Sequence, residues 1–323
     1  MINKPKLYIL TGPTASGKTA VSIDCALQMN GEIISADAIQ VYSGLNIGSA
    51  KPTVEERRGV PHHLIDVADP MEGGFSVSRF RALAFNAAWD IHSRGKTPVV
   101  VGGTGLYINA LTYPLAFSGA PPNVAFRDKI NEIERKEKGA AHRLLAEKDP
   151  ETAKRLHPND VKRVVRALEI IEATGKELSA SSPGFTARDD EALPFAPVMA
   201  ALSMPRELLY ERIDARVDAM FKAGLVEEVK TLLTNGCEAT LPAMQGLGYK
   251  ETAAYLQGQC SLADAIETIK RETRRFAKRQ LTWFRREERI RWFDITQYST
   301  AQALADAITQ YFITGREGAT HGE

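Results

Sequence analysis

Short apolar runs alternate with longer amphipathic stretches along most of the chain. In residues 77–95, Phe80, Ala84 and Ile91 recur with helical spacing and fall on one face. Strands that alternate with helices predict a mostly parallel sheet covered by helices on both faces, an α/β fold whose ligands bind at the carboxyl ends of the strands. Six runs have the length and composition of buried strands: KLYIL (6–10), GEIISA (31–36), HHLIDV (62–67), TPVVVGG (97–103), PVMAALS (197–203) and IRWFDI (290–295).

The alternation stops between about residues 121 and 190. This segment is largely helical in pattern and highly charged, and it contains no strand candidate. We therefore expect an α/β core that begins in residues 1–120, a helical insertion domain at 121–190, and a return to the core with a helical C-terminal region in 191–323.

The segment GPTASGKT (12–19) follows the first predicted strand and precedes a helical stretch. It matches the phosphate-loop spacing G-x-x-x-x-G-K-[ST], in which main-chain N–H groups and a helix N-terminus stabilise phosphate charge. Lys18 would bridge phosphate oxygens, and the Thr19 hydroxyl would ligate Mg²⁺. The motif indicates a phosphate ligand but does not identify the molecule that carries the phosphates. A glycine-rich turn with a surface lysine is the weaker alternative.

Three further strand ends carry candidate chemistry. Asp37 ends the second strand, where it is either a general base or substrate clamp, or the N-cap of a helix. The glycines around Thr104 let a ligand approach the backbone, and Thr104 adds a hydroxyl, although a tight turn without ligand contact would look the same. Asp66 could serve Mg²⁺ in a kinase.

Charge is nearly balanced, with 41 Lys and Arg against 40 Asp and Glu, so a nucleic acid would have to bind a local basic cluster. Two helical stretches, at 160–170 and 269–286, carry such clusters, although a solvated helix face is the usual meaning of a charge run. The 3 cysteines are scattered, which argues against disulfides and structural zinc. We find no signal peptide pattern or long apolar run and expect a cytoplasmic protein.

Nine segments occur in order over nearly the whole chain: GPTASGKT, ISADAIQVY, NIGSAKP, HHLIDV, FSVSRF, VVVGGTGLY, VKRVVRALEI, GLGYKE and RRFAKRQLTWFR. Together they resemble the tRNA dimethylallyltransferase family. The resemblance implies a P-loop NTPase-like core and a Mg²⁺-dependent transfer of a five-carbon allyl group. The donor would be dimethylallyl pyrophosphate, and the acceptor would be the exocyclic amine of the adenosine just 3′ of the tRNA anticodon. A monomer is expected.

The resemblance also implies roles for individual residues. Asp37 would be the base that acts on the amine, and Thr104 would hydrogen-bond the oxygen between the allyl carbon and the pyrophosphate. The pyrophosphate would contact Arg216, with Arg212 as a rival, and the loop residues Gly12, Pro13, Thr14, Ala15, Ser16, Gly17, Lys18 and Thr19. The expected tRNA contacts are Asp37, Ala38, Ile39, Gln40, Arg127, Lys162, Arg163, Arg166, Met244, Gln245, Gly246, Leu247, Gly248, Tyr249, Lys250, Arg274, Arg275 and Lys278.

Two positions depart from the family pattern. Ala38 stands where a serine is usual, and Asn46 stands where an aspartate is common. The missing serine hydroxyl affects one acceptor contact and leaves the base in place. Two alternatives remain open from the sequence: an ATP-dependent small-molecule kinase, and a non-catalytic RNA-binding protein that retains a phosphate loop.

Overall fold

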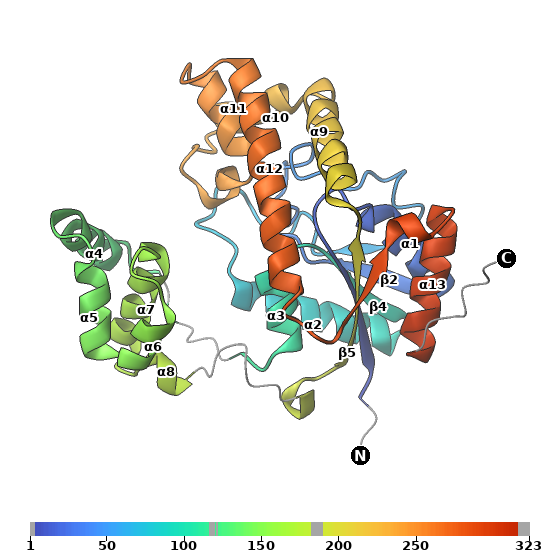
Figure 1. The fold of residues 1–323 in the computed structure, drawn as a ribbon, viewed down its shortest axis with the longest axis horizontal. Helices are drawn as coiled ribbons and strands as arrows, with labels where there is room; N and C mark the ends of the chain where they lie inside the picture. Colours follow the sequence, from blue (N-terminus) through green and yellow to red (C-terminus); the bar gives the residue numbers. More distant parts are fainter. Residues whose placement is uncertain (1–3, 116–119, 121, 182–189, 316–323) are drawn as a thin grey trace. The chain divides into compact units, whose positions relative to one another are not determined.

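The computed structural model describes residues 4–115, 120, 122–181 and 190–315, and the chain divides into two compact units (Figure 1). The core unit comprises residues 1–112 and 193–323, and the helical unit comprises residues 113–192. The residues expected to form an insertion, 121–190, lie within the helical unit.

The core unit is built on a six-stranded sheet with the order β3-β2-β4-β1-β5-β6, in which every neighbouring pair is parallel. This confirms the predicted α/β fold, and each predicted strand is present. The third is much shorter than expected, because Leu64 and Asp66 adopt φ angles of 62° and 57°, which an extended strand cannot contain. The strands are β1 (Lys6–Thr11), β2 (Gly31–Ser35), β3 (His62–His63), β4 (Thr97–Val101), β5 (Ala196–Ser203) and β6 (Ile290–Asp294).

Helices cover both faces of this sheet. The side chains of β1 alternate between the faces: Leu7 and Ile9 pack with α2 and α3, whereas Leu10 packs with α1 and α13. Figure 1 shows α13 beside α1. The helices of the core unit are α1 (Lys18–Gln28), α2 (Val77–Ser93), α3 (Gly105–Thr112), α9 (Arg206–Lys222), α10 (Leu225–Thr234), α11 (Tyr249–Leu256), α12 (Leu262–Phe284) and α13 (Ala301–Thr314).

A second apolar cluster in the core unit lies outside the sheet. Val41, Tyr42 and Leu45, which follow β2, pack there against Val229 of α10 and Tyr249 of α11. The chain after β2 is therefore anchored to the C-terminal helices.

The helical unit has its own core, in which Ile130, Leu145, Val164 and Leu168 are buried together. Its helices are α4 (Val124–Lys136), α5 (Ala140–Lys148), α6 (Pro150–Arg155), α7 (Val161–Thr174) and α8 (Leu178–Ser181).

Among the described residues, no helix is both long and apolar enough to cross a membrane. The three cysteines, Cys25, Cys237 and Cys260, carry free thiols.

Candidate active site

A cavity of about 500 Å³ lies in the core unit at the carboxyl ends of β1, β2 and β4. Its lining joins parts of the chain that are far apart in sequence: Thr14–Ala20 of the phosphate loop and α1, Asp37 and Gln40 after β2, Gly102 and Gly103 after β4, Arg212 and Arg216 of α9, and Gln280 of α12. Ligands of parallel α/β sheets bind at this edge.

The phosphate loop has the backbone that its sequence predicts. Gly12 has a φ of 138°, and a Cβ atom there would lie 2.8 Å from the carbonyl oxygen of Leu202, so the turn requires glycine. Helix α1 begins at Lys18, which places its positive N-terminal end at the loop. The loop is therefore shaped for an anion.

The Lys18 ammonium lies within this loop and donates to the carbonyl oxygen of Pro13 at 2.6 Å. Desolvation and, to a smaller extent, the charge of Arg216 lower its pKa to about 7, although the carboxylate of Asp37 opposes both effects. A bound anion would add further negative charge and so favour the charged form of Lys18.

Two arginines of α9 line the cavity, Arg212 and Arg216. Burial lowers the pKa of Arg216, while Asp37 and Glu56 favour its charged form. Arg216 thus faces the same space as Lys18 and Asp37. Because both arginines line the cavity, their relative importance for the pyrophosphate stays a prediction.

The carboxylate of Asp37 forms part of a turn. Its Oδ1 accepts hydrogen bonds from the N–H groups of Ile39 at 2.8 Å and Gln40 at 3.2 Å. A turn and not a helix follows Asp37. Its carboxylate therefore caps this turn, and the residue is not a helix N-cap. A carboxylate has two oxygens, and the second can accept a further partner at the cavity.

Thr104 lies beside this turn. Its Oγ1 accepts a hydrogen bond from the Ala38 N–H at 3.0 Å, so the hydroxyl keeps its own hydrogen for donation. Ala38 and Ile39 are half-buried, and each packs against one of the apolar clusters of the core unit.

Gln280 was not predicted as a site residue, and its side chain is buried at 6% exposure. Its Oε1 accepts from the Thr14 N–H at 2.8 Å, and its Nε2 donates to the Gly103 carbonyl at 2.9 Å. A Cβ atom on Gly103 would lie 2.2 Å from this Nε2, so a side chain at 103 would displace the Gln280 amide. The sequence did contain a signal for a buried polar side chain. Gln280 lies one helical turn after Phe276 and one before Phe284, so it falls on the apolar face of a basic helix.

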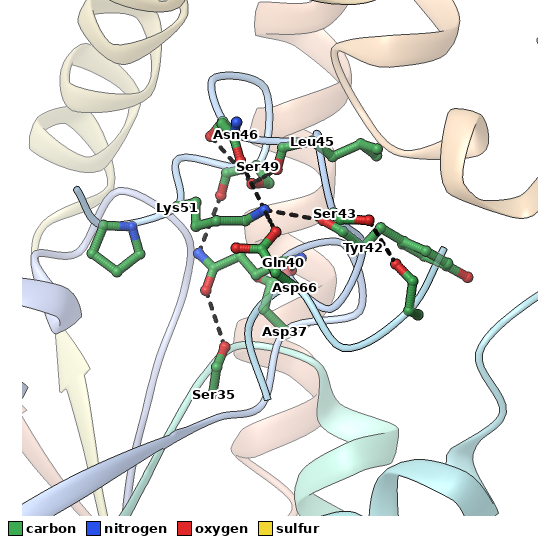
Figure 2. A network of polar contacts seen from close by, with 12 residues as sticks. Ser35, Asp37, Gln40, Tyr42, Ser43, Leu45, Asn46, Ser49, Lys51 and Asp66 are labelled. Atoms are coloured by element: carbon green, nitrogen blue, oxygen red, sulfur yellow. Dashed lines mark hydrogen bonds and ion pairs between the residues drawn. The ribbon is translucent and has the colours of Figure 1, made fainter. Parts of the chain in front are cut away.

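A polar network organises residues 37–51, which we call the Asp37 loop. Figure 2 shows the Gln40 side chain within it: Oε1 accepts from the Ser35 hydroxyl at 3.0 Å, and Nε2 donates to the carbonyls of Ser49 and Ala50. The loop therefore folds back around Gln40.

Glu228 of α10 holds the far end of the Asp37 loop. Its carboxylate accepts from the N–H groups of Asn46, Ile47 and Gly48 and from the Tyr249 hydroxyl, the last at 2.7 Å. These contacts join the loop to the C-terminal helices.

Asp66 does not occupy the position that a kinase would require. Its Oδ1 accepts from the Lys51 ammonium at 2.5 Å, and Asp66 is not among the residues that line the cavity. The structure therefore gives no support to the Mg²⁺ role that Asp66 would have in a kinase. The reason is the left-handed backbone at Leu64 and Asp66, which ends the strand early and turns the chain toward Lys51.

Within the predicted segment 244–250, Met244 and Tyr249 are fully buried, so their side chains pack inside the core unit and direct contact with RNA does not fit them. These two residues instead pack around a tight turn. Gln245 and Lys250 are exposed, Leu247 is half-buried, and Gly246 and Gly248 form the turn.

The predicted basic residues of α12 differ in their surroundings. Arg274 pairs with Asp214 at 2.5 Å, and Arg275 pairs with Glu272 at 2.7 Å. Lys278 is exposed.

In the helical unit, Arg127 and Arg166 both pair with the buried Glu169, whereas Lys162 and Arg163 of α7 are exposed. Arg127 and Arg166 therefore have a structural contact of their own, and the tRNA role of all four stays a prediction.

The IPP transferase family model matches residues 40–287. The tRNA dimethylallyltransferase of Desulforudis audaxviator is 51% identical over 91% of this chain and 93% of its own. The crystal structure of a tRNA isopentenylpyrophosphate transferase from Bacillus halodurans is 43% identical in sequence and has a TM-score of 0.71. The match covers 97% of this chain and 96% of that chain. For a eukaryotic dimethylallyltransferase acting on tRNA, the identity is 32%, the TM-score 0.81 and the coverages 98% and 81%. With this extent of agreement in sequence and structure, the chain belongs to the IPP transferase family.

Proposed function

We propose that this protein transfers a dimethylallyl group from dimethylallyl pyrophosphate to the exocyclic amine of the adenosine directly 3′ of the anticodon in tRNA. The relatives named tRNA dimethylallyltransferase, which align over nearly the whole chain, support the reaction. The observation that carries the proposal for this chain is a cavity whose lining includes the phosphate loop, the two arginines of α9 and the Asp37 carboxylate.

The cations of the cavity serve the leaving group. Ionisation of an allyl pyrophosphate places negative charge on the departing oxygens, and main-chain N–H groups, Lys18 and Arg216 can stabilise that charge. Thr19 lines the same cavity in the first turn of α1, so its hydroxyl fits the Mg²⁺ that phosphate-loop enzymes use. Mg²⁺, when bound, would neutralise part of the pyrophosphate charge.

The carboxylate serves the acceptor. An adenine amine is a weak nucleophile because its lone pair is delocalised into the ring, so placement beside the allyl carbon matters more than activation. Asp37 would remove the proton from nitrogen as the N–C bond forms, and this is worth about 10²–10⁴-fold in rate. Thr104 would donate its free hydrogen to the oxygen that leaves the allyl carbon.

The tRNA would present this adenosine outside its base stack, at a cost of roughly a few kcal/mol. Exposed basic residues of α12 and α7 supply candidate contacts to the backbone of the anticodon stem-loop. A tRNA acceptor supports a cytoplasmic location, and we expect the protein to act as a monomer.

Mass analysis of nucleosides tests this proposal. Unmodified tRNA is incubated with Mg²⁺, the protein and dimethylallyl pyrophosphate, then digested to nucleosides. The expected product is adenosine heavier by one five-carbon allyl group, and mass analysis of nuclease fragments of the same tRNA should place it only at the position 3′ of the anticodon. A parallel incubation with ATP and candidate alcohols should give no phosphorylated product. ATP-dependent phosphorylation without allyl transfer would replace the proposal with the kinase alternative.

A further inference from the structure

Lys51 ends the Asp37 loop with its ammonium enclosed by that loop. Its side chain is 5% exposed, although Lys51 does not line the cavity. The ammonium donates to the Tyr42 carbonyl at 3.0 Å, the Asn46 Oδ1 at 2.9 Å and the Asp66 Oδ1 at 2.5 Å (Figure 2). An ammonium has three donors, so all three are used.

Asp66 connects this ammonium to Gln40. While its side chain accepts from Lys51, its backbone N–H donates to the Gln40 carbonyl at 3.2 Å. The N–H groups of Val67 and Ala68 then donate to the Val41 carbonyl. Residues 66–68 thus lie along residues 40–41, and Lys51 fastens that contact from one side.

Gln40 connects the network to Asp37. The Gln40 N–H donates to the Asp37 Oδ1, and the Gln40 side chain donates to the carbonyls of Ser49 and Ala50, which directly precede Lys51. The turn that carries the carboxylate is therefore held at its Gln40 end by groups that contact Lys51 or adjoin it.

Three oxygen atoms from separate parts of the chain converge on the Lys51 ammonium. Without a cation, the Asp66 carboxylate and the Tyr42 carbonyl would repel each other across this space, which would weaken the contact between residues 66–68 and residues 40–41. Burial of an ammonium is unfavourable unless it is fully paired, so an apolar side chain would fill the same space at lower cost. The charge therefore has a role that packing does not explain.

We infer that Lys51 is a positioning residue: with Asp66 as its counterion, it fixes the Asp37 loop so that the Asp37 carboxylate faces the acceptor amine. This rests on the proposed function, because it assigns Asp37 to the acceptor. The donor side is independent of Lys51, because the pyrophosphate groups belong to the phosphate loop and α9.

The test compares Lys51→Met with Lys230→Met, a matched change on the exposed face of α10. With both substrates saturating, the single-turnover rate of allyl transfer by Lys51→Met should fall by about 10-fold to 100-fold, since small displacements of catalytic groups cost this much. Its Kd for dimethylallyl pyrophosphate should change by less than about twofold. Lys230→Met should match the wild type in both measurements.

A charge-relocation pair gives an independent readout. Asp66→Asn leaves Lys51 without a carboxylate partner and should also slow the transfer. Asn46→Asp combined with Asp66→Asn returns one carboxylate to the ammonium, now at the Asn46 position, and should recover most of the rate. If the contact only stabilised the fold, these variants would change the melting temperature. The transfer rate would then neither fall in Asp66→Asn nor recover in the double variant.

Each outcome decides the inference. A wild-type rate for Lys51→Met overturns it, and so does a loss of donor affinity that parallels the loss of rate. If circular dichroism shows that Lys51→Met does not fold, the Asp66 pair decides, because it keeps Lys51; absence of recovery then overturns the inference. Failure of the proposed function would instead appear as an inactive wild type.

Discussion

Thr104 Oγ1 accepts a hydrogen bond from the Ala38 N–H at 3.0 Å, which joins the end of β4 to the turn that carries the Asp37 carboxylate. The contact uses a lone pair of the hydroxyl and orients its hydrogen away from Ala38. Thr104 is therefore held in place by the Asp37 turn, and its hydroxyl keeps a hydrogen that it can donate.

Two replacements of Thr104 distinguish the hydrogen bond that its hydroxyl donates from the packing of its side chain. Thr104→Ser keeps the hydroxyl and should retain the transfer rate within about threefold. Thr104→Val keeps the shape but removes the donor, and should lower the rate by about 10²-fold, the usual effect of losing one donor to a developing oxyanion. Rapid-quench measurement of allyl transfer checks both variants. A Thr104→Val enzyme with wild-type rate would restrict Thr104 to a turn.

Asp37→Asn separates the two roles of the Asp37 carboxylate. The amide oxygen of Asn can still accept from the N–H groups of Ile39 and Gln40, so the turn should persist, but it cannot take a proton. We expect the transfer rate to fall by about 10²–10⁴-fold. The affinity for dimethylallyl pyrophosphate should stay equal or rise, because a negative charge near Lys18 and Arg216 is removed.

Asp37→Ala is the control for this change. It removes the cap as well as the base, and should cost about 1 kcal/mol of folding stability in addition to activity. Isothermal calorimetry, thermal melts and rate measurements on both variants distinguish the roles. Full activity of Asp37→Asn would mean that the residue only closes its turn.

The sequence predicted the sheet well because strand and helix periodicities are local properties. The exception, residues 62–67, is an apolar run whose backbone turns at Leu64 and Asp66. Nothing in apolarity alone distinguishes a buried loop from a buried strand.

The candidate site was predictable only where its chemistry lies in consecutive residues. The phosphate loop is a contiguous spacing and could be found directly. Gln280 reaches Thr14 across 266 positions, and Glu228 reaches Ile47 across 181. Contacts of this kind depend on how the helices pack, which one sequence does not reveal. Burial likewise decided against RNA contact for Tyr249, which had been expected to contact the tRNA.

Lys18 should make pyrophosphate binding dependent on pH. Mainly through desolvation, its pKa is lowered to about 7 from an ordinary value of 10.5. Above pH 7, the Lys18 side chain is therefore neutral in much of the free enzyme. A bound pyrophosphate favours the ammonium, so binding must take up a proton, and affinity should fall as pH rises above about 7. Calorimetry in buffers of different ionisation enthalpy, at about pH 8, should show uptake approaching one proton per site.

Lys18→Met provides the comparison. It should bind dimethylallyl pyrophosphate more weakly, lose the proton uptake, and keep near-normal affinity for tRNA. Equal loss of both affinities would contradict the assignment of Lys18 to the donor side, and proton uptake that persists in the variant would show that another group titrates.

The basic face of α12 should contribute to tRNA affinity unevenly. Exposed Lys278 should act as a full phosphate contact, so Lys278→Gln should reduce the slope of log affinity against log salt by about 0.7–0.9. Arg274→Gln should have a smaller effect, because Asp214 already neutralises part of its charge. Conversely, Asp214→Asn should strengthen binding. Filter binding over a salt series checks all three, and unchanged slopes would leave α12 as a solvated face.

Glu169 should make the helical unit sensitive to acid. Burial alone would raise its pKa, but hydrogen bonds from Arg127, the Asn123 N–H and Arg166 lower it to about 2. Its folded-state pKa thus lies below the ordinary 4.5, so its contribution to stability is complete above about pH 4.5 and is lost as pH falls toward 2.

Glu169→Gln should destabilise the helical unit by about 2–3 kcal/mol at neutral pH, below the usual cost of breaking a buried pair because both arginines are partly exposed and can hydrate. Hydrogen exchange at the amides of α4 and α7 in the whole chain measures this local stability. Glu172→Gln, an exposed change on the same helix, is the control. Equal protection in the two variants would show that the Glu169 pairs contribute nothing; a selective loss would mean that Arg127 and Arg166 hold this unit together before they meet any RNA.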